Sequence, residues 1–145
     1  MKISDLLSPT GVMIDVRTPN KRSLLEELAA VAAANVGLPI DQVTSLLLKR
    51  EQLGSTGTGN GIAIPHGRLP GLKRPQGLLA KLKQGIEFDA IDGRAVDLVF
   101  VLLLPAAESD ALAALALVAR TLRSPEVLAR LRAAKTSSEL YGALA

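Results

Sequence analysis

The stretch Asp97-Leu-Val-Phe-Val-Leu-Leu-Leu104 is apolar at almost every position, and it lies between Gly93 and Pro105. Its length suits a β-strand, and no apolar run of the chain approaches the roughly 20 residues that a membrane helix needs. Continuous apolar character, without alternation, is typical of a strand that is buried on both faces. We therefore expect residues 97–104 to form the central strand of a sheet flanked by helices on both faces.

Five segments have the apolar spacing or the end signals of α-helices. Leu24, Leu28 and Val31 recur on one face of a helix predicted over residues 21–36. Asn20 is suited to cap its start, and Gly37 to end it in a left-handed conformation. Similar signals predict helices over residues 41–53, 109–122, 125 to about 134, and 136–144.

Three further segments have the character of strands. Val12, Ile14 and Val16 alternate with more polar residues, which predicts a strand that buries these three side chains on one face. Residues 79–83 alternate less regularly, and residues 62–64 form a short apolar run before Pro65. Strands interleaved with helices predict an α/β fold, and we expect residues 1–145 to form a single domain.

Charge and composition exclude several classes of function. The net charge is +3, with 17 basic and 14 acidic residues scattered along the chain. Only three aromatic side chains are present, so neither a concentrated basic face nor a stacking platform for nucleic acid is expected. There is no cysteine, and we expect no metal and no cofactor. The N-terminus lacks the pattern of a secretory signal, which favours a cytoplasmic protein that is not embedded in a membrane.

A glycine-rich segment is the most unusual part of the sequence. Four of the 12 glycines fall within the eight residues 54–61. Glycine permits positive φ angles and close approach of the backbone, so successive amides can converge on an anion such as phosphate. The spacing fits neither a P-loop nor a dinucleotide-binding loop. The candidate phosphate-loop residues are Gly54, Ser55, Thr56, Gly57, Gly59, Asn60 and Gly61.

His66, the only histidine, follows this segment directly. An imidazole with an ordinary pKa of about 6.5 is largely neutral near pH 7, so one ring nitrogen is free to attack phosphorus. A phosphoryl group in transfer carries its charge on three oxygens and needs cationic or N–H partners. Arg50 at the end of the preceding helix and Arg68, two residues beyond His66, are the candidates for this role.

The segment GSTGTGNGIAIPHGR at residues 54–68, preceded by KREQL, resembles the active-site signature of phosphotransferase-system enzyme IIA of the fructose/mannitol type. FDAIDGRAVDLVFVLLLPA, LALVARTL and RLRAAKTSSELYGAL are similar to its nitrogen-regulatory branch, so the resemblance covers nearly the whole chain. It implies a central mixed β-sheet, His66 as the phosphoacceptor and Arg50 as its supporting arginine. It also implies an HPr-type phosphocarrier as donor, and regulated targets such as potassium-transport or sensor-kinase proteins.

One departure from the family concerns a second histidine. Relatives usually carry an active-site His-Leu pair after the apolar strand, whereas this chain has Ala111-Leu112. No second imidazole can orient or stabilise phosphohistidine here. This departure bears on the rate of transfer more than on the identity of the acceptor.

Two other functions stay open at this stage. The chain could be a sugar-specific IIA subunit that feeds a separate IIB partner, or a non-catalytic module that binds a phosphorylated metabolite. Asp89 and Asp92 could suggest a pair of catalytic carboxylates, but Asp92-Gly93 is a turn signal between two predicted strands. We therefore interpret them as turn residues.

Overall fold

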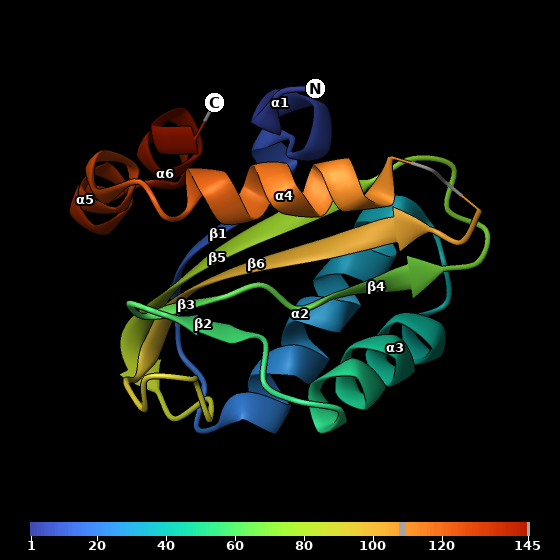
Figure 1. Ribbon diagram of the computed structural model, residues 1–145, viewed down its shortest axis with the longest axis horizontal. Helices are drawn as coiled ribbons and strands as arrows, with labels where there is room; N and C mark the ends of the chain where they lie inside the picture. The colour runs from blue at the N-terminus through green and yellow to red at the C-terminus, as the bar shows by residue number, and fades with distance from the viewer. Residues whose placement is uncertain (108–109, 145) are drawn as a thin grey trace.

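The computed structural model describes residues 1–107 and 110–144, and six strands in this part of the chain form one mixed sheet (Figure 1). The strand order is β1-β5-β6-β3-β2, and β4 also pairs with β6. Strand β5 is antiparallel to β6, whereas β3 and β4 run parallel to β6 and β1 runs parallel to β5. The strands are β1 (Val12–Val16), β2 (Gly57–Gly59), β3 (Ile62–Ala63), β4 (His66–Leu69), β5 (Gln76–Ile86) and β6 (Val96–Pro105).

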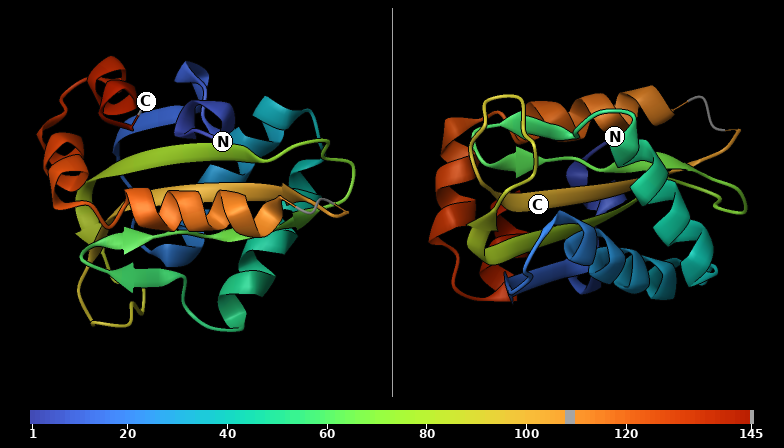
Figure 2. Two further views of the ribbon diagram at one scale, coloured as in Figure 1. Left: turned by 45° about the horizontal axis from the view of Figure 1, so that its top comes forward. Right: turned by 90° about the horizontal axis from the view of Figure 1, so that it is seen from below.

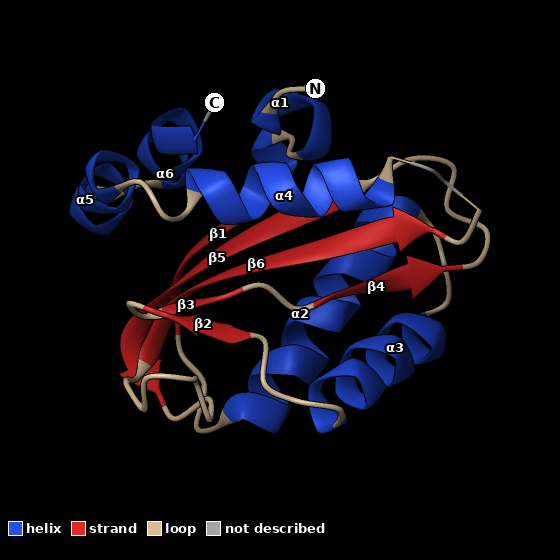
Figure 3. Ribbon diagram, in the orientation of Figure 1, coloured by secondary structure: helices blue, strands red, loops and turns tan. Residues whose placement is uncertain are grey.

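Helices cover both faces of this sheet, and each face has its own hydrophobic core (Figures 1 and 2). On one face lie α2 (Lys21–Val36) and α3 (Ile40–Gln52). The other face carries α1 (Ile3–Leu6), α4 (Ala111–Thr121), α5 (Pro125–Ala133) and α6 (Ser137–Leu144), with a short 3-10 turn, η1 (Pro9–Gly11), before β1. Figure 3 shows the resulting layers of helix, sheet and helix. The predicted α/β fold with a central mixed sheet is confirmed.

Strand β6 occupies the position predicted for residues 97–104. Val99, Val101 and Leu103 point into the core beneath α2 and α3. Leu98, Phe100 and Leu102 point into the opposite core. Because a strand sends alternate side chains to opposite faces, burial of both sets requires apolar residues at every position. This requirement explains the unbroken apolar run.

The prediction for β1 is wrong for one residue. Val12 and Ile14 pack against the core beneath α4, but Val16 lies in the opposite core. The reason is Asp15, whose φ of +55° interrupts the strand between Met13 and Val16, where the register with β5 also shifts. An irregularity of this kind reverses the alternation of side chains beyond it.

This conformation of Asp15 leads to a prediction about stability. Asp15→Val is expected to lower the free energy of unfolding by about 1–2 kcal/mol, because a β-branched residue is strained in the left-handed region. Asp15→Gly should cost much less, since glycine adopts positive φ without strain. Urea denaturation followed by circular dichroism measures both changes. Equal losses for the two variants would contradict the assigned cause.

The predicted ends of the helices are largely confirmed. The Asn20 side chain accepts a hydrogen bond from the Ser23 amide at 2.8 Å, and Gly37 ends α2 with a φ of +71°. Helix α3 spans residues 40–52 rather than 41–53. Helix α4 begins at Ala111, and the predicted start at Ser109 lies outside the described residues. None of the helices in the described part of the chain has both the length and the apolar content to cross a membrane.

Candidate functional site

A groove of about 890 Å³ lies between α3 and β4. Helix α3 contributes Lys49 and Arg50 to its wall, and β4 contributes His66 and Arg68. These β4 residues are in place because β4 pairs in parallel with the end of β6, where His66 is opposite Leu102. The structure therefore brings Arg50, His66 and Arg68, which are up to 18 positions apart in sequence, to one surface.

The ring of His66 is half-buried and is hydrogen-bonded to the main chain two residues before it. Its Nδ1 lies 2.7 Å from the carbonyl oxygen of Ile64. A carbonyl oxygen can only accept a hydrogen bond, so Nδ1 carries the hydrogen. In the neutral ring the lone pair is then on Nε2. This geometry leaves Nε2 as the ring nitrogen with an available lone pair, a choice that the sequence leaves open.

Gly67 allows α3 to approach β4 closely. A Cβ atom at this position would lie 2.7 Å from Cδ1 and 2.8 Å from Cγ of Leu46 on α3. Gly67 therefore faces α3. The side chains of His66 and Arg68 leave the other face of β4, and because β4 pairs only with β6 among the described strands, both residues still border the groove at this edge of the sheet. Because Gly67 has no side chain, α3 with Arg50 can lie directly beside β4 with His66.

Both candidate arginines are oriented by backbone carbonyl oxygens. Arg50 Nη1 donates to the Gly54 oxygen at 2.9 Å. Arg68 Nη1 donates to the Pro105 oxygen at 3.2 Å, at the end of β6, and to the Ala106 oxygen at 3.4 Å. A guanidinium has N–H donors in a fixed plane, so these contacts with backbone carbonyls orient the fork of each arginine.

The glycine-rich segment does not line the groove, and four of its amides donate to groups within the fold. Gly57–Gly59 forms β2, which pairs with β3, so part of the predicted loop is a hairpin. The Gly54 amide donates to the Glu51 carbonyl, and the Thr56 amide donates to the Glu51 carboxylate. The Gly57 amide donates to the Ser55 hydroxyl, and the Asn60 amide donates to the Asp92 carboxylate. Residues 54–61 are absent from the described lining of the groove. The prediction of a phosphate cradle around His66 therefore gains no support from these four amides.

The positive φ angles of this segment serve the hairpin turn instead. Asn60 and Gly61 have φ angles of +59° and +80°. A Cβ atom on Gly61 would lie 2.6 Å from Nη2 of Arg132, and this guanidinium also bonds the Asn60 carbonyl and Asp97. Close approach of the backbone is needed here, as predicted from composition, but the approaching group belongs to α5.

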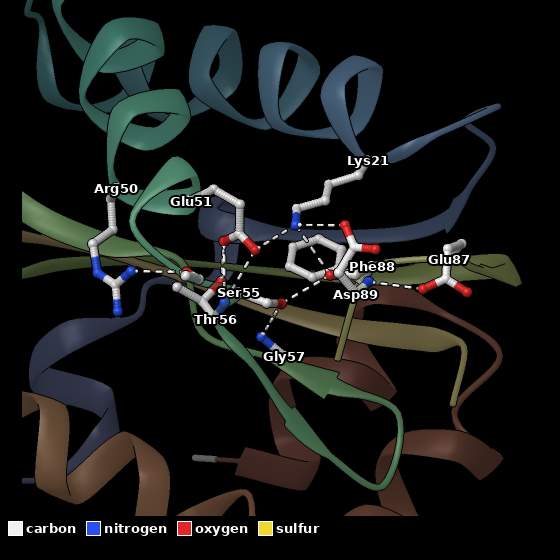
Figure 4. A network of polar contacts seen from close by, with 10 residues as sticks. Lys21, Arg50, Glu51, Ser55, Thr56, Gly57, Glu87, Phe88 and Asp89 are labelled. Atoms are coloured by element: carbon white, nitrogen blue, oxygen red, sulfur yellow. Dashed lines mark hydrogen bonds and ion pairs between the residues drawn. The ribbon is translucent and has the colours of Figure 1, made fainter. Parts of the chain in front are cut away.

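Sequence reasoning missed a buried ionic network beside Arg50 (Figure 4). Glu51 forms an ion pair with Lys21 at 2.7 Å and accepts hydrogen bonds from Thr56. One signal could have revealed it. Val43, Leu47 and Glu51 are spaced four apart, so Glu51 continues the buried stripe of α3. A carboxylate on an apolar face must have partners.

Asp89 and Asp92 occupy the turn between β5 and β6, as the sequence predicts. The Gly93 amide donates to the Ala90 carbonyl at 2.9 Å. The amides of Asn60 and Arg94 donate to the Asp92 carboxylate, and these hydrogen bonds hold its pKa below the usual value. Asp89 pairs with Lys21 at 3.4 Å. The two carboxylates thus have separate structural partners.

Comparisons with known proteins agree with this architecture. Residues 5–145 match the family described as phosphoenolpyruvate-dependent sugar phosphotransferase system, EIIA 2. A nitrogen regulatory protein from Bradyrhizobium diazoefficiens is 44% identical over 146 residues, covering 100% of this chain and 95% of that protein. The crystal structure of nitrogen regulatory protein IIA-Ntr from Neisseria meningitidis has a TM-score of 0.91 at 32% identity, covering 99% of both chains.

A more distant neighbour shares the fold. The mannitol enzyme IIA of Escherichia coli, solved in complex with its phosphorylated enzyme IIB, has a TM-score of 0.79 at 16% identity, covering 96% of this chain and 98% of that one. The family match and the relatives that are 32% and 44% identical confirm the resemblance seen in residues 54–68. The chain belongs to the EIIA 2 family of the phosphotransferase system, and nitrogen regulatory proteins are among its relatives there.

Proposed function

We propose that this chain is a phosphocarrier of the nitrogen-regulatory type. In this proposal His66 accepts a phosphoryl group from an HPr-type donor, and the phosphorylation state of the protein regulates its partners. The main supporting observation is the hydrogen bond from His66 Nδ1 to the Ile64 carbonyl, which leaves Nε2 as the nucleophile. His66 also lines the groove together with two arginines. Its nitrogen regulatory relatives support the regulatory role.

The proposed transfer step uses the lone pair of Nε2. The Nε2 lone pair attacks phosphorus, a new N–P bond forms, and the P–N bond to the donor's imidazole breaks, so its electron pair leaves with that imidazole. The phosphorylated ring is positively charged and keeps the Nδ1 hydrogen, which the Ile64 carbonyl stabilises. Arg50 and Arg68, the two guanidinium groups on the groove wall, would bind the phosphoryl oxygens.

Phosphorylation would change the charge of the groove strongly. Lys49, Arg50 and Arg68 make part of its wall cationic. A phosphoryl group introduces a charge of about −2 and several strong acceptors, so most of the positive charge presented to a partner is neutralised and the hydrogen bonding of the surface changes. A cytoplasmic potassium-transport or sensor-kinase protein is the kind of partner whose binding would differ between the two phosphorylation states.

The test is phosphorylation of the purified protein by a phosphorylated HPr-type carrier. Intact-protein mass spectrometry should show the gain of one phosphoryl group, which is lost in acid and maps to the peptide containing residues 62–68. Acid lability distinguishes phosphohistidine from phosphoserine and phosphothreonine. No uptake, or uptake that maps outside this peptide, would overturn the proposal.

A second candidate is a sugar-specific IIA subunit, which the fold shared with the mannitol enzyme favours. It requires onward transfer from His66 to a sugar-specific IIB protein. Incubating the phosphorylated chain with fructose- and mannitol-type IIB proteins separates the two functions, since the regulatory proposal expects no rapid transfer. The third function, a module that captures a metabolite in the glycine-rich segment, is weakened because amides of that segment are used internally.

Gly67 provides a test of the groove geometry. Gly67→Ala is expected to slow phosphorylation about 10- to 100-fold, because the new Cβ must push Leu46 and α3 away and shift Arg50 relative to His66. Gly142→Ala is a matched control, since a Cβ there meets nothing within 4 Å. The initial rate of phosphoryl uptake measures the effect. Parent-like rates for Gly67→Ala would show that the spacing between α3 and β4 does not matter.

A further inference from the structure

Glu51 carries an almost fully enclosed carboxylate at the end of α3. Its side chain is 5% exposed, and that of its partner Lys21 is 20% exposed, with 2.7 Å between Nζ and Oε2. Thr56 donates through its amide, 3.0 Å from Oε2, and through its hydroxyl, 2.5 Å from Oε1 (Figure 4). Burial of a charged carboxylate is costly unless its oxygens are paired, so this arrangement needs every member.

Lys21 lies at a position in α2 where the helix itself does not favour a lysine, so its pairing with Glu51 has to be explained by contacts outside α2. Lys21 is the first residue of α2, where a positive charge opposes the helix dipole. Its ammonium group bonds the Phe88 carbonyl at 3.1 Å and lies 4.8 Å from the centroid of the Phe88 ring. The cost to the helix is offset by contacts with other elements, so Lys21 anchors Glu51 to the body of the protein.

A continuous series of hydrogen bonds leads from Glu51 to His66. The Thr56 amide and hydroxyl bond the carboxylate, and the Thr56 carbonyl accepts from the Ile64 amide at 3.0 Å. The Ile64 carbonyl in turn accepts from His66 Nδ1 at 2.7 Å. The carboxylate therefore holds the peptide groups that determine which nitrogen of the imidazole carries hydrogen.

A second branch leads from the same residue to Arg50. The Glu51 carbonyl accepts from the Gly54 amide at 3.2 Å, and the Gly54 carbonyl accepts from Arg50 Nη1 at 2.9 Å. Arg50 and Glu51 leave the last turn of α3 in different directions (Figure 4). Arg50 reaches the groove, and the main-chain carbonyl of Glu51 fixes the turn that orients Arg50.

We propose that Glu51 is the positioning residue of the phosphoryl-accepting site, a role that rests on the proposed function of His66. Anchored by Lys21, its carboxylate fixes Thr56 and thereby the Ile64 carbonyl that selects the Nδ1–H form of His66. The same residue holds the Gly54 carbonyl against Arg50. Loss of the charge at Glu51 loosens Thr56 and the Ile64 carbonyl, whereas the main-chain branch to Gly54 and Arg50 stays in place.

The test uses Glu51→Gln with Asp89→Asn as the matched control. Asp89 contacts the same Lys21 ammonium, but its side chain is 77% exposed. Because His66 is the only histidine, the imidazole ¹⁵N signals of the full chain report on this ring alone. Glu51→Gln should lower the population of the Nδ1–H form and slow phosphorylation by the HPr-type carrier about 10- to 100-fold. Asp89→Asn should leave both unchanged.

A second pair of variants keeps the proposal falsifiable if Glu51→Gln does not fold. Thr56→Val removes the hydroxyl that binds Glu51 and should shift the same ¹⁵N signals, and Thr56→Ser should restore them. A folded Glu51→Gln with the tautomer and rate of the parent overturns the proposal, as does a parent-like tautomer in Thr56→Val. If the parent takes up no phosphoryl group, the proposed function fails, and the tautomer measurement still decides the role of Glu51.

Discussion

Replacing His66 with glutamine is expected to abolish phosphoryl uptake from the HPr-type donor, with a fall in rate of at least about 10³-fold. The amide nitrogen of glutamine has no lone pair available for attack on phosphorus, whereas imidazole Nε2 has one that the Ile64 carbonyl keeps free by binding Nδ1–H. Intact-protein mass spectrometry over a time course measures the loss.

Two further measurements test whether the loss of uptake is due to the missing imidazole. His66 is only half-buried, so the variant should unfold at nearly the same urea concentration as the parent. Arg50→Met keeps His66, and its rate of phosphorylation should be about 10²–10³-fold lower than that of the parent, because the variant lacks the cation proposed to bind the phosphoryl oxygens. Phosphorylation of His66→Gln to the parental level would show that another residue is the acceptor.

Phe100→Ala is expected to lower the free energy of unfolding by about 3–5 kcal/mol. Phe100 is 0% exposed at the centre of β6, in the core beneath α4. Its ring also occupies the space above Gly77 of β5, where a Cβ atom would lie 2.6 Å from ring carbons. Truncation leaves a cavity above β5, and Gly77 has no side chain to fill it.

Urea denaturation followed by circular dichroism measures this loss. Ile91→Ala is the matched control, since Ile91 is 86% exposed in the turn between β5 and β6 and its truncation should change the unfolding free energy by less than about 0.5 kcal/mol. A loss below about 1 kcal/mol for Phe100→Ala would mean that the sheet can collapse around the gap, contrary to close packing of the core.

The sequence by itself determined the elements whose signals are local. The periodic apolar faces of α2 and α3, the caps at Asn20 and Gly37, and the unbroken apolar run of β6 each depend on residues within a few positions of one another. The family signature around His66 likewise lies in one contiguous segment. These features could be recognised without knowledge of the partners that each element meets.

Only the tertiary structure decided the features that depend on distant partners. The left-handed Asp15 moves Val16 to the other core, and the Thr56 and Asn60 amides of the glycine-rich segment donate to Glu51 and Asp92. The Lys21–Glu51 pair joins residues on two helices. A hydrogen bond or an ion pair carries no periodic signature in the sequence, because its formation depends on which surfaces packing brings together.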